Sequence, residues 1–490
     1  MPQPRGSEGR DRWLRTMAVC LACVAVSLLG AISPVAAQTL TEAFAYAYNN
    51  NPQLLAERSA LRATDENVPQ ALAGWRPTVN FTGSAGYTRG GFEQPGANTP
   101  SNPFACNGPI GATCSTPTQF SSFVSKSVDL QVVQPIYRGG RTEAQTRSAI
   151  NTVHAERAHV LAVETQVFQN VALAYLDVVR DQTLVEVARN NEAVLRKQLE
   201  ATRDRFRVGE VTRTDVAQAE SSLAQATAQR INAEGQLEVS RAEYAHAVGH
   251  PPGRLILPRE RPALPATREE ALSLAANDNP NVIAASFTEL AARDNVSFVR
   301  GQLLPQISIV GDLNRSFAPS LTLRGTREDA ASVTARVTMP LYEGGAVYSQ
   351  TRQAEQTVGQ RRSQVDDARR LAVQNATNAW ETLQAARAAI ASFGAAVRAA
   401  QIALEGTQQE ALVGSRTVLD VLIAEQQLFT TQSQLVQAQH DAALQEFNLA
   451  SATGRLIAPE MKLPVQLYDM DRHYKQVKDK WFGFGGGLKE

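Results

Sequence analysis

Residues that carry catalytic or metal chemistry are scarce in this chain of 490 residues, which has only six histidines and four cysteines. They do not cluster at the spacing of metal ligands. The sequence has neither a phosphate-binding Gly-x-x-x-x-Gly-Lys loop nor a Gly-x-Ser-x-Gly nucleophile motif. We therefore expect no enzyme activity, no catalytic residue, no cofactor and no dedicated metal site.

Excess charge is missing as well, because 48 Lys and Arg balance 48 Asp and Glu. A chain without a basic surplus has no electrostatic reason to bind nucleic acid, so we expect no nucleic-acid partner. Aromatic residues make up only 6% of the chain, whereas Ala, Gln, Val and Leu are abundant. This composition favours long helices over a large globular core.

Long apolar runs are absent except near the N-terminus, where the stretch from Met17 to Ile32 carries no charge. The stretch follows several arginines and precedes the small residues Val35-Ala36-Ala37. At about 16 residues it falls short of the ~20 that a spanning helix needs. Residues 1–37 are therefore predicted to be a secretory signal peptide, with an uncleaved membrane anchor as the alternative.

Two cysteines lie beyond this peptide, Cys106 and Cys114, in a segment rich in Pro, Asn, Gly and Thr. In an oxidising compartment they could close a short loop as a disulfide. Metal binding is the weaker interpretation, because two thiols without a nearby histidine do not complete a zinc site.

An internal duplication organises the rest of the chain. Early markers recur 228 residues later, namely Thr39-Leu-Thr-Glu42 as Thr267-Arg-Glu-Glu270, Asn51-Pro52 as Asn279-Pro280, and Pro77 as Pro305. Later markers recur after 205 residues, namely Pro135-Ile-Tyr-Arg-Gly-Gly140 as Pro340-Leu-Tyr-Glu-Gly-Gly345, Val208-Gly209 as Val413-Gly414, and Asp215-Val216 as Asp420-Val421. The first copy thus holds 23 extra residues around the two cysteines, as expected of an insertion in an exposed loop.

Each copy is predicted to run helix, strand, strand, long helix, tip and return helix. The first repeat is predicted at 38–253, with strands at about 77–90 and 122–137 and a tip at about 205–216. After a linker at 254–266, the second repeat is predicted at 267–457, with strands at about 305–317 and 330–342 and a tip at about 410–422. A tail with a flexible end is predicted at 458–490.

The strands alternate apolar and polar residues, as Val79, Phe81 and Tyr87 do against their polar neighbours. Such a period of two predicts a sheet with one apolar and one polar face. A strand of about ten residues is long enough to cross an outer membrane with tilt. A soluble β-sandwich would show the same alternation and is the alternative.

Long helices are predicted from the lack of helix breakers. The chain from Arg141 to Arg207 has neither proline nor glycine, which predicts a helix of about 100 Å at 1.5 Å per residue. We expect its counterpart at Ala346–Leu412, a return helix at about Thr212–Gly249, and one further continuous helix from Thr267 to Arg300. Small apolar residues repeat every 3.5 residues in the return helices, which predicts coiled-coil packing.

Four strands are too few to close a barrel, because about eight is the smallest number. In lipid an open edge would leave backbone groups unpaired, so a membrane-inserted sheet requires at least two chains. With the polar strand faces turned inward, the closed barrel would be a water-filled pore.

The duplication, together with the tips Val208-Gly-Glu-Val-Thr-Arg-Thr-Asp-Val216 and Val413-Gly-Ser-Arg-Thr-Val-Leu-Asp-Val-Leu422, resembles the TolC family of outer-membrane factors. The resemblance covers about Gln38 to Leu463. It implies an α+β membrane protein, a homotrimer in which four strands per chain complete a 12-stranded outer-membrane β-barrel set in lipid. Below the barrel it implies a long α-helical coiled-coil tunnel in the periplasm.

The implied function is a passive channel that exports the substrates of a tripartite efflux pump or a type I secretion system. Its implied partners are a periplasmic adaptor (membrane fusion protein) and an inner-membrane transporter of the ABC or RND type. By the same resemblance, Thr214, Asp215 and Arg416 match the links that hold the periplasmic end closed. Asp420 matches an acidic position around the aperture, where three carboxylates would select and bind cations.

The tip turns are implied to engage adaptor hairpins through Val208, Gly209, Val413 and Gly414. Two positions depart from the family pattern, because Ile423 replaces a second acidic ring position and Ala411 replaces a tyrosine of the closure network. A thinner or differently connected closure is therefore expected. For each charged residue, an ordinary solvated surface charge is the alternative interpretation.

Two further choices stay open. The sequence does not separate small-molecule efflux from protein secretion. A soluble periplasmic coiled-coil adaptor or structural protein would share the helical hairpins, although it would not need four strands of membrane-spanning length.

Overall fold

A computed structural model describes residues 38–92, 95–97, 113–115, 119–258, 261–318 and 325–484. The predicted signal peptide, Cys106, the side chain of Cys114 and residues 485–490 lie outside this description, so the disulfide stays a prediction. Two compact units divide the chain. The helical unit comprises Met1–Leu61, Glu156–Ala285 and Val365–Met470, and the sheet unit comprises Arg62–Ala155, Ser286–Gln364 and Asp471–Glu490.

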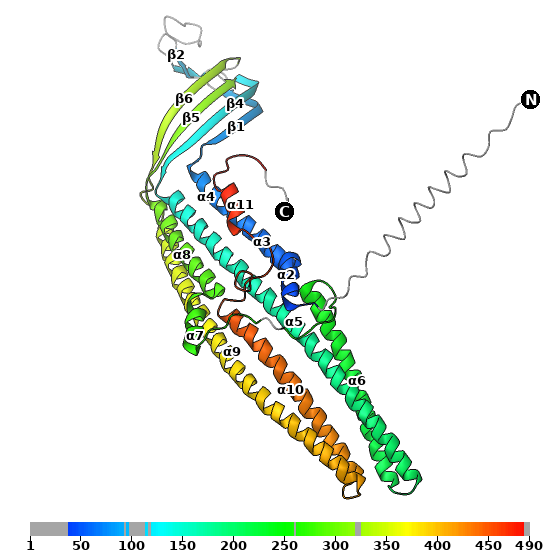
Figure 1. Cartoon of the computed structure of the whole chain (residues 1–490). Coiled ribbons are helices and arrows are strands. Elements are labelled where there is room, and N and C mark those ends of the chain that lie inside the picture. Colours follow the sequence, from blue (N-terminus) through cyan, green and yellow to red (C-terminus); the bar gives the residue numbers. More distant parts are fainter. Residues whose placement is uncertain are drawn as a thin grey trace, which may run out of the picture. The chain divides into compact units, whose positions relative to one another are not determined.

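Two helices of 67 residues, α5 (Arg141–Arg207) and α9 (Ala346–Leu412), contribute to both units (Figure 1). Their bounds agree with those expected, although α9, unlike α5, contains three glycines, Gly359, Gly394 and Gly406. Each helix ends just before a tip glycine in the left-handed region, with φ of 82° at Gly209 and 79° at Gly414. Glycine adopts this conformation without the steric cost that a Cβ brings, so the chain turns sharply there.

The return helices are α6 (Arg213–Val248) and α10 (Val418–Ala452). Their predicted apolar seam is buried at several positions, among them Ala219 and Leu237 in α6 and Ala438 and Leu449 in α10. Small residues at these positions let the helices approach closely, as coiled-coil packing requires.

Short helices flank the long ones: α2 (Leu40–Asn50), α3 (Pro52–Asp65) and α4 (Asn67–Leu72) in the first copy, and α7 (Arg268–Asn277) and α8 (Pro280–Arg300) in the second. The expectation of one continuous helix from Thr267 to Arg300 was wrong. Proline has no N–H and disfavours helical geometry in the residue before it, so the helix breaks before Pro280. Pro52 breaks the first copy in the same way.

The two copies make equivalent hydrogen bonds at these helix breaks. The side-chain amide of Asn51 donates to the carbonyl of Ala247 at 3.2 Å, and that of Asn279 donates to the carbonyl of Ala452 at 3.0 Å. The donors are 228 residues apart and the acceptors 205. Each asparagine thereby ties a helix break to the end of the return helix in its own copy.

The sheet unit holds four antiparallel strands in the order β1 (Thr78–Phe92), β4 (Gln119–Arg138), β5 (Gln306–Phe317) and β6 (Arg327–Thr338). A separate pair, β2 (Pro95–Ala97) and β3 (Thr113–Ser115), lies in the inserted loop. β6 ends at Thr338, earlier than the expected 342, opposite Gln306, the residue at which its partner β5 begins.

One face of the four-stranded sheet is apolar and uncovered. Phe81, Leu130, Leu313 and Ala331 lie opposite one another across the strands, and Phe81 remains 73% exposed. A soluble sandwich would cover such a face with a second sheet. In the part of the chain that the structure describes, strands β1 and β6 each pair on one side only, so the sheet has two open edges.

The core of the helical unit gathers large buried side chains, including Phe44, Phe168, Tyr175 and Phe447. The segment predicted as a linker takes part in it, since the Tyr175 hydroxyl donates to the carbonyl of Ile256 at 2.8 Å. The tail takes part as well, because Ala458 and Leu463 are buried in this core.

The tail continues as α11 (Met470–Val477), and its Tyr474 packs, in the sheet unit, against a buried apolar cluster that includes Val68 and Val153. Two short 3₁₀ turns, η1 (Ala73–Trp75) and η2 (Gly301–Leu303), lead into β1 and β5. In the described part of the chain, none of the helices has the length and hydropathy needed to cross a membrane.

Candidate functional site: the two hairpin tips

The tips that join α5 to α6 and α9 to α10 have the same backbone design. In the first, the N–H of Gly209 donates to the carbonyl of Phe206, and in the second the N–H of Gly414 donates to that of Ala411. Val208 and Val413 beside these glycines are 71% and 80% exposed. A Cβ on either glycine would meet nothing within 4 Å, so both turns stand open to an approaching partner.

Both acidic residues of the predicted gate act as helix caps. Asp215 accepts hydrogen bonds from the backbone N–H and hydroxyl of Thr212 at 2.8 and 2.7 Å. Asp420 accepts the same pair from Thr417, at 2.9 Å each. These capping boxes satisfy backbone donors at the first turns of α6 and α10.

The caps also set the charge state of the two carboxyl groups. Bonds from the hydroxyl and then the N–H of Thr212 hold the pKa of Asp215 below its ordinary value. Bonds from the N–H and then the hydroxyl of Thr417, with the nearby Arg416 charge, do the same for Asp420. Both carboxylates are therefore negative at neutral pH.

Arg416 pairs within its own hairpin, because its Nε lies 2.9 Å from Oε2 of Glu410. In the first tip the polarity is reversed, since Arg205 on the long helix lies 4.0 Å from Glu210 in the turn. Both pairs are exposed, so each contributes little to stability. Among the described ion pairs, none joins Arg416 to Asp215.

The two hairpins meet through apolar residues. Val418 and Leu422 at the start of α10 share a buried cluster with Leu195 and Leu199 of α5 and with Ala219 of α6. The structure therefore brings the hairpins of one chain together, while the charged gate residues stay within their own turns. Thr214 is exposed on the first turn of α6.

Comparison with known proteins identifies the class. The family model described as outer membrane efflux protein matches residues 45–250 and 271–455, one stretch for each copy. The chain belongs to this family, whose members include TolC.

Individual relatives agree along most of their length. The outer membrane efflux protein BepC of Brucella suis is 34% identical over 94% of this chain and 96% of the relative. The outer membrane protein TolC of Vibrio cholerae is 27% identical over 86% of this chain and 92% of the relative. The CmeC outer membrane channel of Campylobacter jejuni shares the fold, with a TM-score of 0.72 at 16% identity over 90% of this chain and 89% of that one.

As a member of the family, the chain is an outer-membrane channel for efflux or secretion that extends into the periplasm, and it is not an enzyme. The alternative of a soluble adaptor does not hold. Within the described ranges, no group of three or more His, Cys, Asp or Glu side chains is placed to hold a metal ion.

A buried ionic cluster missed by sequence reasoning links helices of this channel wall. In α5, Arg180 pairs with Asp177 at 2.7 Å and with Asp181 at 2.7 Å. Ser240 of α6 donates to Asp181. The Nε2 of His440 in α10 lies 2.9 Å from Oδ1 of Asp177, close enough for an ion pair although the ring is not aimed along a hydrogen bond.

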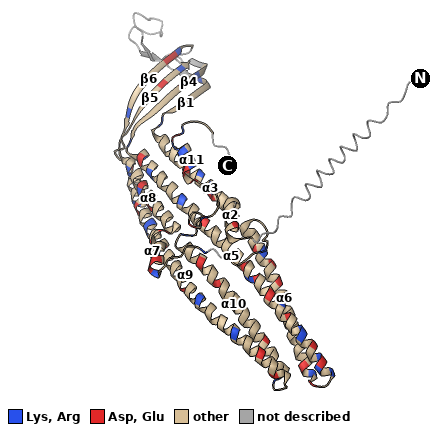
Figure 2. Cartoon of the chain, viewed as in Figure 1, with Lys and Arg blue, Asp and Glu red and all other residues tan. Residues whose placement is uncertain are grey.

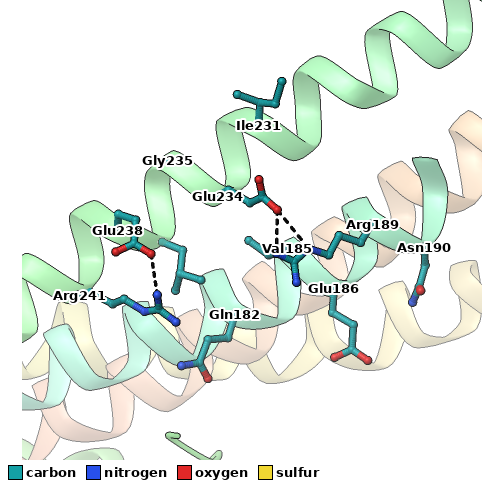
Figure 3. A pocket seen from close by; sticks show the side chains of 11 residues that line it. Gln182, Val185, Glu186, Arg189, Asn190, Ile231, Glu234, Gly235, Glu238 and Arg241 are labelled. Carbon is teal, nitrogen blue, oxygen red and sulfur yellow. Dashed lines mark hydrogen bonds and ion pairs between the residues drawn. The ribbon is translucent and has the colours of Figure 1, made fainter. Parts of the chain in front are cut away.

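Charged residues of both signs follow the helices (Figure 2). Along the α5–α6 hairpin they flank an open groove of about 860 Å³ beside Gly235 (Figure 3). Arg189 pairs with Glu234 and Arg241 with Glu238 on its walls. The charges of these two pairs neutralise one another, and Glu186 adds a further carboxylate to the lining of the groove.

Proposed function

We propose that three copies of the chain close their sheets into one 12-stranded barrel, continued into the periplasm by a tunnel of α5, α6, α9 and α10 from each copy. The observation that carries this proposal is the open, four-stranded sheet with an exposed apolar face. In lipid, the unpaired edges of β1 and β6 would each leave a row of backbone groups without partners. Pairing β1 of one copy with β6 of the next satisfies both edges at once.

The number of copies rests on the family resemblance, since four strands alone require only two or more chains. It is tested by the mass of the detergent-solubilised protein from light scattering corrected for bound detergent. A mass of three chains is expected, and a mass of one chain would contradict the barrel.

The tips form the gate in this proposal. Three copies would bring three Asp420 side chains around one aperture, where ionised carboxylates attract and bind cations. Thr214, Asp215 and Arg416 would link neighbouring hairpins in the closed state. Arg416 is held by Glu410 within its own chain, so a closing link requires Arg416 either to leave Glu410 or to bridge both carboxylates.

Opening is assigned to partner proteins. The exposed Val208, Gly209, Val413 and Gly414 would be met by the hairpins of a periplasmic adaptor, and an inner-membrane ABC or RND-type transporter would supply the energy. The open space around both glycines supports this, because a partner helix can approach the backbone there. Similarity to BepC, an efflux protein by name, favours efflux over protein secretion as the route served.

Single-channel conductance in planar bilayers tests the gate. Replacing Arg416 with Ser is expected to raise conductance, because a closing link is lost. Arg213→Ser removes an exposed arginine from the other tip and serves as the matched control, with conductance unchanged. Divalent cations are expected to block the wild-type pore from the periplasmic side and to lose this effect in Asp420→Asn. If Arg416→Ser conducts like the wild type, Arg416 has no part in closure.

A further inference from the structure

The C-terminal segment places aromatic side chains at the end of the sheet from which the helices leave. All four strands meet that end, since Thr78, Arg138, Gln306 and Thr338 are the terminal residues there. After α11 the chain reads Lys480-Trp481-Phe482-Gly483-Phe484. Trp481 is 58% exposed and Phe482 86% exposed, an unusual display for large apolar side chains.

Arg76, two residues before β1, holds this segment in place. Its Nη1 donates to the carbonyl of Lys480 at 2.7 Å, and its guanidinium lies 5.0 Å from the ring centroid of Trp481. One arginine therefore fixes both the backbone and the indole of the segment. Contacts within the sheet unit therefore hold the exposed aromatic segment in position.

The chain just before Arg76 lies toward the apolar face of the sheet. Gln134 is on that face, because it follows Leu130 and Val132 at intervals of two residues along β4 and pairs with Ile309. Its side-chain amide donates to the carbonyl of Trp75 at 3.0 Å, which brings the residue before Arg76 to the same side.

Other exposed apolar residues complete a band at this end of the sheet: Trp75, Ile136, Tyr137, Leu304, Met339, Leu341 and Tyr342. Aromatic rings with a polar atom concentrate where acyl chains meet lipid headgroups, because one part of the ring is apolar and the other is hydrated. If the apolar face of the sheet is in contact with lipid, the band at its end lies at the level where acyl chains meet headgroups.

We propose that Trp481, Phe482 and Phe484 insert into the phospholipid interface of the periplasmic leaflet, with Arg76 as their positioning residue. The tail would then fix the height of the sheet in the bilayer. The inference relies on the barrel of the proposed function, with which the band is continuous. The competing interpretation is that a neighbouring copy of the chain, rather than lipid, covers these aromatic side chains.

Tryptophan quenching by brominated phospholipids tests the insertion in reconstituted full-length protein. Trp13, Trp75 and Trp380 are replaced with Phe, so that Trp481 is the only indole. Its emission is expected to fall when bromine is carried near the headgroup end of the acyl chains. A variant retaining only Trp380, which lies in the helical unit, should show no loss.

A third variant reports on the barrel itself, with Phe81→Trp as the only tryptophan. Quenching of this residue shows that the strands are in the bilayer. If it is quenched while Trp481 is not, the inference about the tail fails and the barrel stands. If neither is quenched, the barrel fails as well.

The role of Arg76 is tested by adding Arg76→Ala both to the chain that retains only Trp481 and to the Phe81→Trp reference chain. Arg76→Ala is expected to reduce the quenching of Trp481 and to leave the quenching of the Phe81→Trp reference unchanged. Protection of Trp481 from both brominated lipid and aqueous iodide would instead identify a neighbouring copy as the occupant and overturn the inference.

Discussion

At the junction between the sheet and the long helices, the cost of backbone strain at a glycine can be separated from the cost of crowding by a Cβ. Gly139 between β4 and α5 has a φ of 65°, and its repeat equivalent Gly344 has a φ of 62°. A Cβ on Gly344 would meet nothing within 4 Å. A Cβ on Gly139 would collide with the carbonyl oxygen of Gly301 and lie 2.8 Å from Cβ of Leu304, where ordinary contact starts at 3.4 Å.

The expected costs follow from these contacts. Gly344→Ala carries only the strain of a left-handed alanine, about 1–2 kcal/mol. Gly301→Ala carries only crowding, since its Cβ would lie 2.6 Å from the carbonyl oxygen of Gly139, at a cost of about 1–3 kcal/mol. Gly139→Ala carries both, so the free energy of unfolding should fall by about 2–5 kcal/mol.

Urea unfolding in detergent, followed by circular dichroism of the helices, measures these losses. All variants must be compared at one chain concentration, because assembly makes stability depend on it. The expected order of loss is Gly139→Ala, then Gly301→Ala, with Gly344→Ala the smallest or equal to Gly301→Ala. Equal losses for Gly139→Ala and Gly344→Ala would show that close packing at the junction contributes nothing, and would refute the reasoning.

Two further predictions concern the helices. Burial lowers the pKa of His440, but the carboxylates of Asp177 and Asp441 outweigh burial and raise it above the ordinary value. The pairing of protonated His440 with these carboxylates therefore stabilises the folded chain. Its contribution is fully present below the pKa of about 6.5 that histidine has in the unfolded chain, and it is lost as pH rises through the pKa of His440 in the folded chain. His440→Gln should therefore lower the free energy of unfolding more at low pH than at high pH. If the difference in unfolding free energy between the wild type and His440→Gln does not change with pH, the pairing of His440 with the carboxylates is contradicted. Thr417→Ala removes a cap from α10 and should cost about 1 kcal/mol in the same urea titration, whereas Thr214→Ala should cost almost nothing.

The sequence was sufficient for the long helices and the four strands, because both rest on local patterns. The absence of glycine and proline sets the bounds of α5, and alternation reveals the strands. The break before Pro280 was equally local and was missed, although the same Asn-Pro pair marks both copies.

The tips show where a local signal was overlooked and where none exists. Thr212-x-x-Asp215 and Thr417-x-x-Asp420 are capping-box patterns, so the caps could have been predicted from the sequence. The pairing of Arg416 with Glu410 depends on how the turn folds back. The contact of His440 with Asp177 joins residues 263 positions apart. No periodicity encodes such a distant meeting, which follows only from the packing of α10 against α5.

The two open edges of the sheet have a consequence for biogenesis. An unpaired strand edge is a template for any other strand, and long exposed edges lead to aggregation. A single chain that entered lipid alone would carry β1 and β6 unpaired and would have no stable resting state there. Barrel closure and chain association must then be one event, which makes the yield of functional protein depend steeply on the local concentration of newly exported chains.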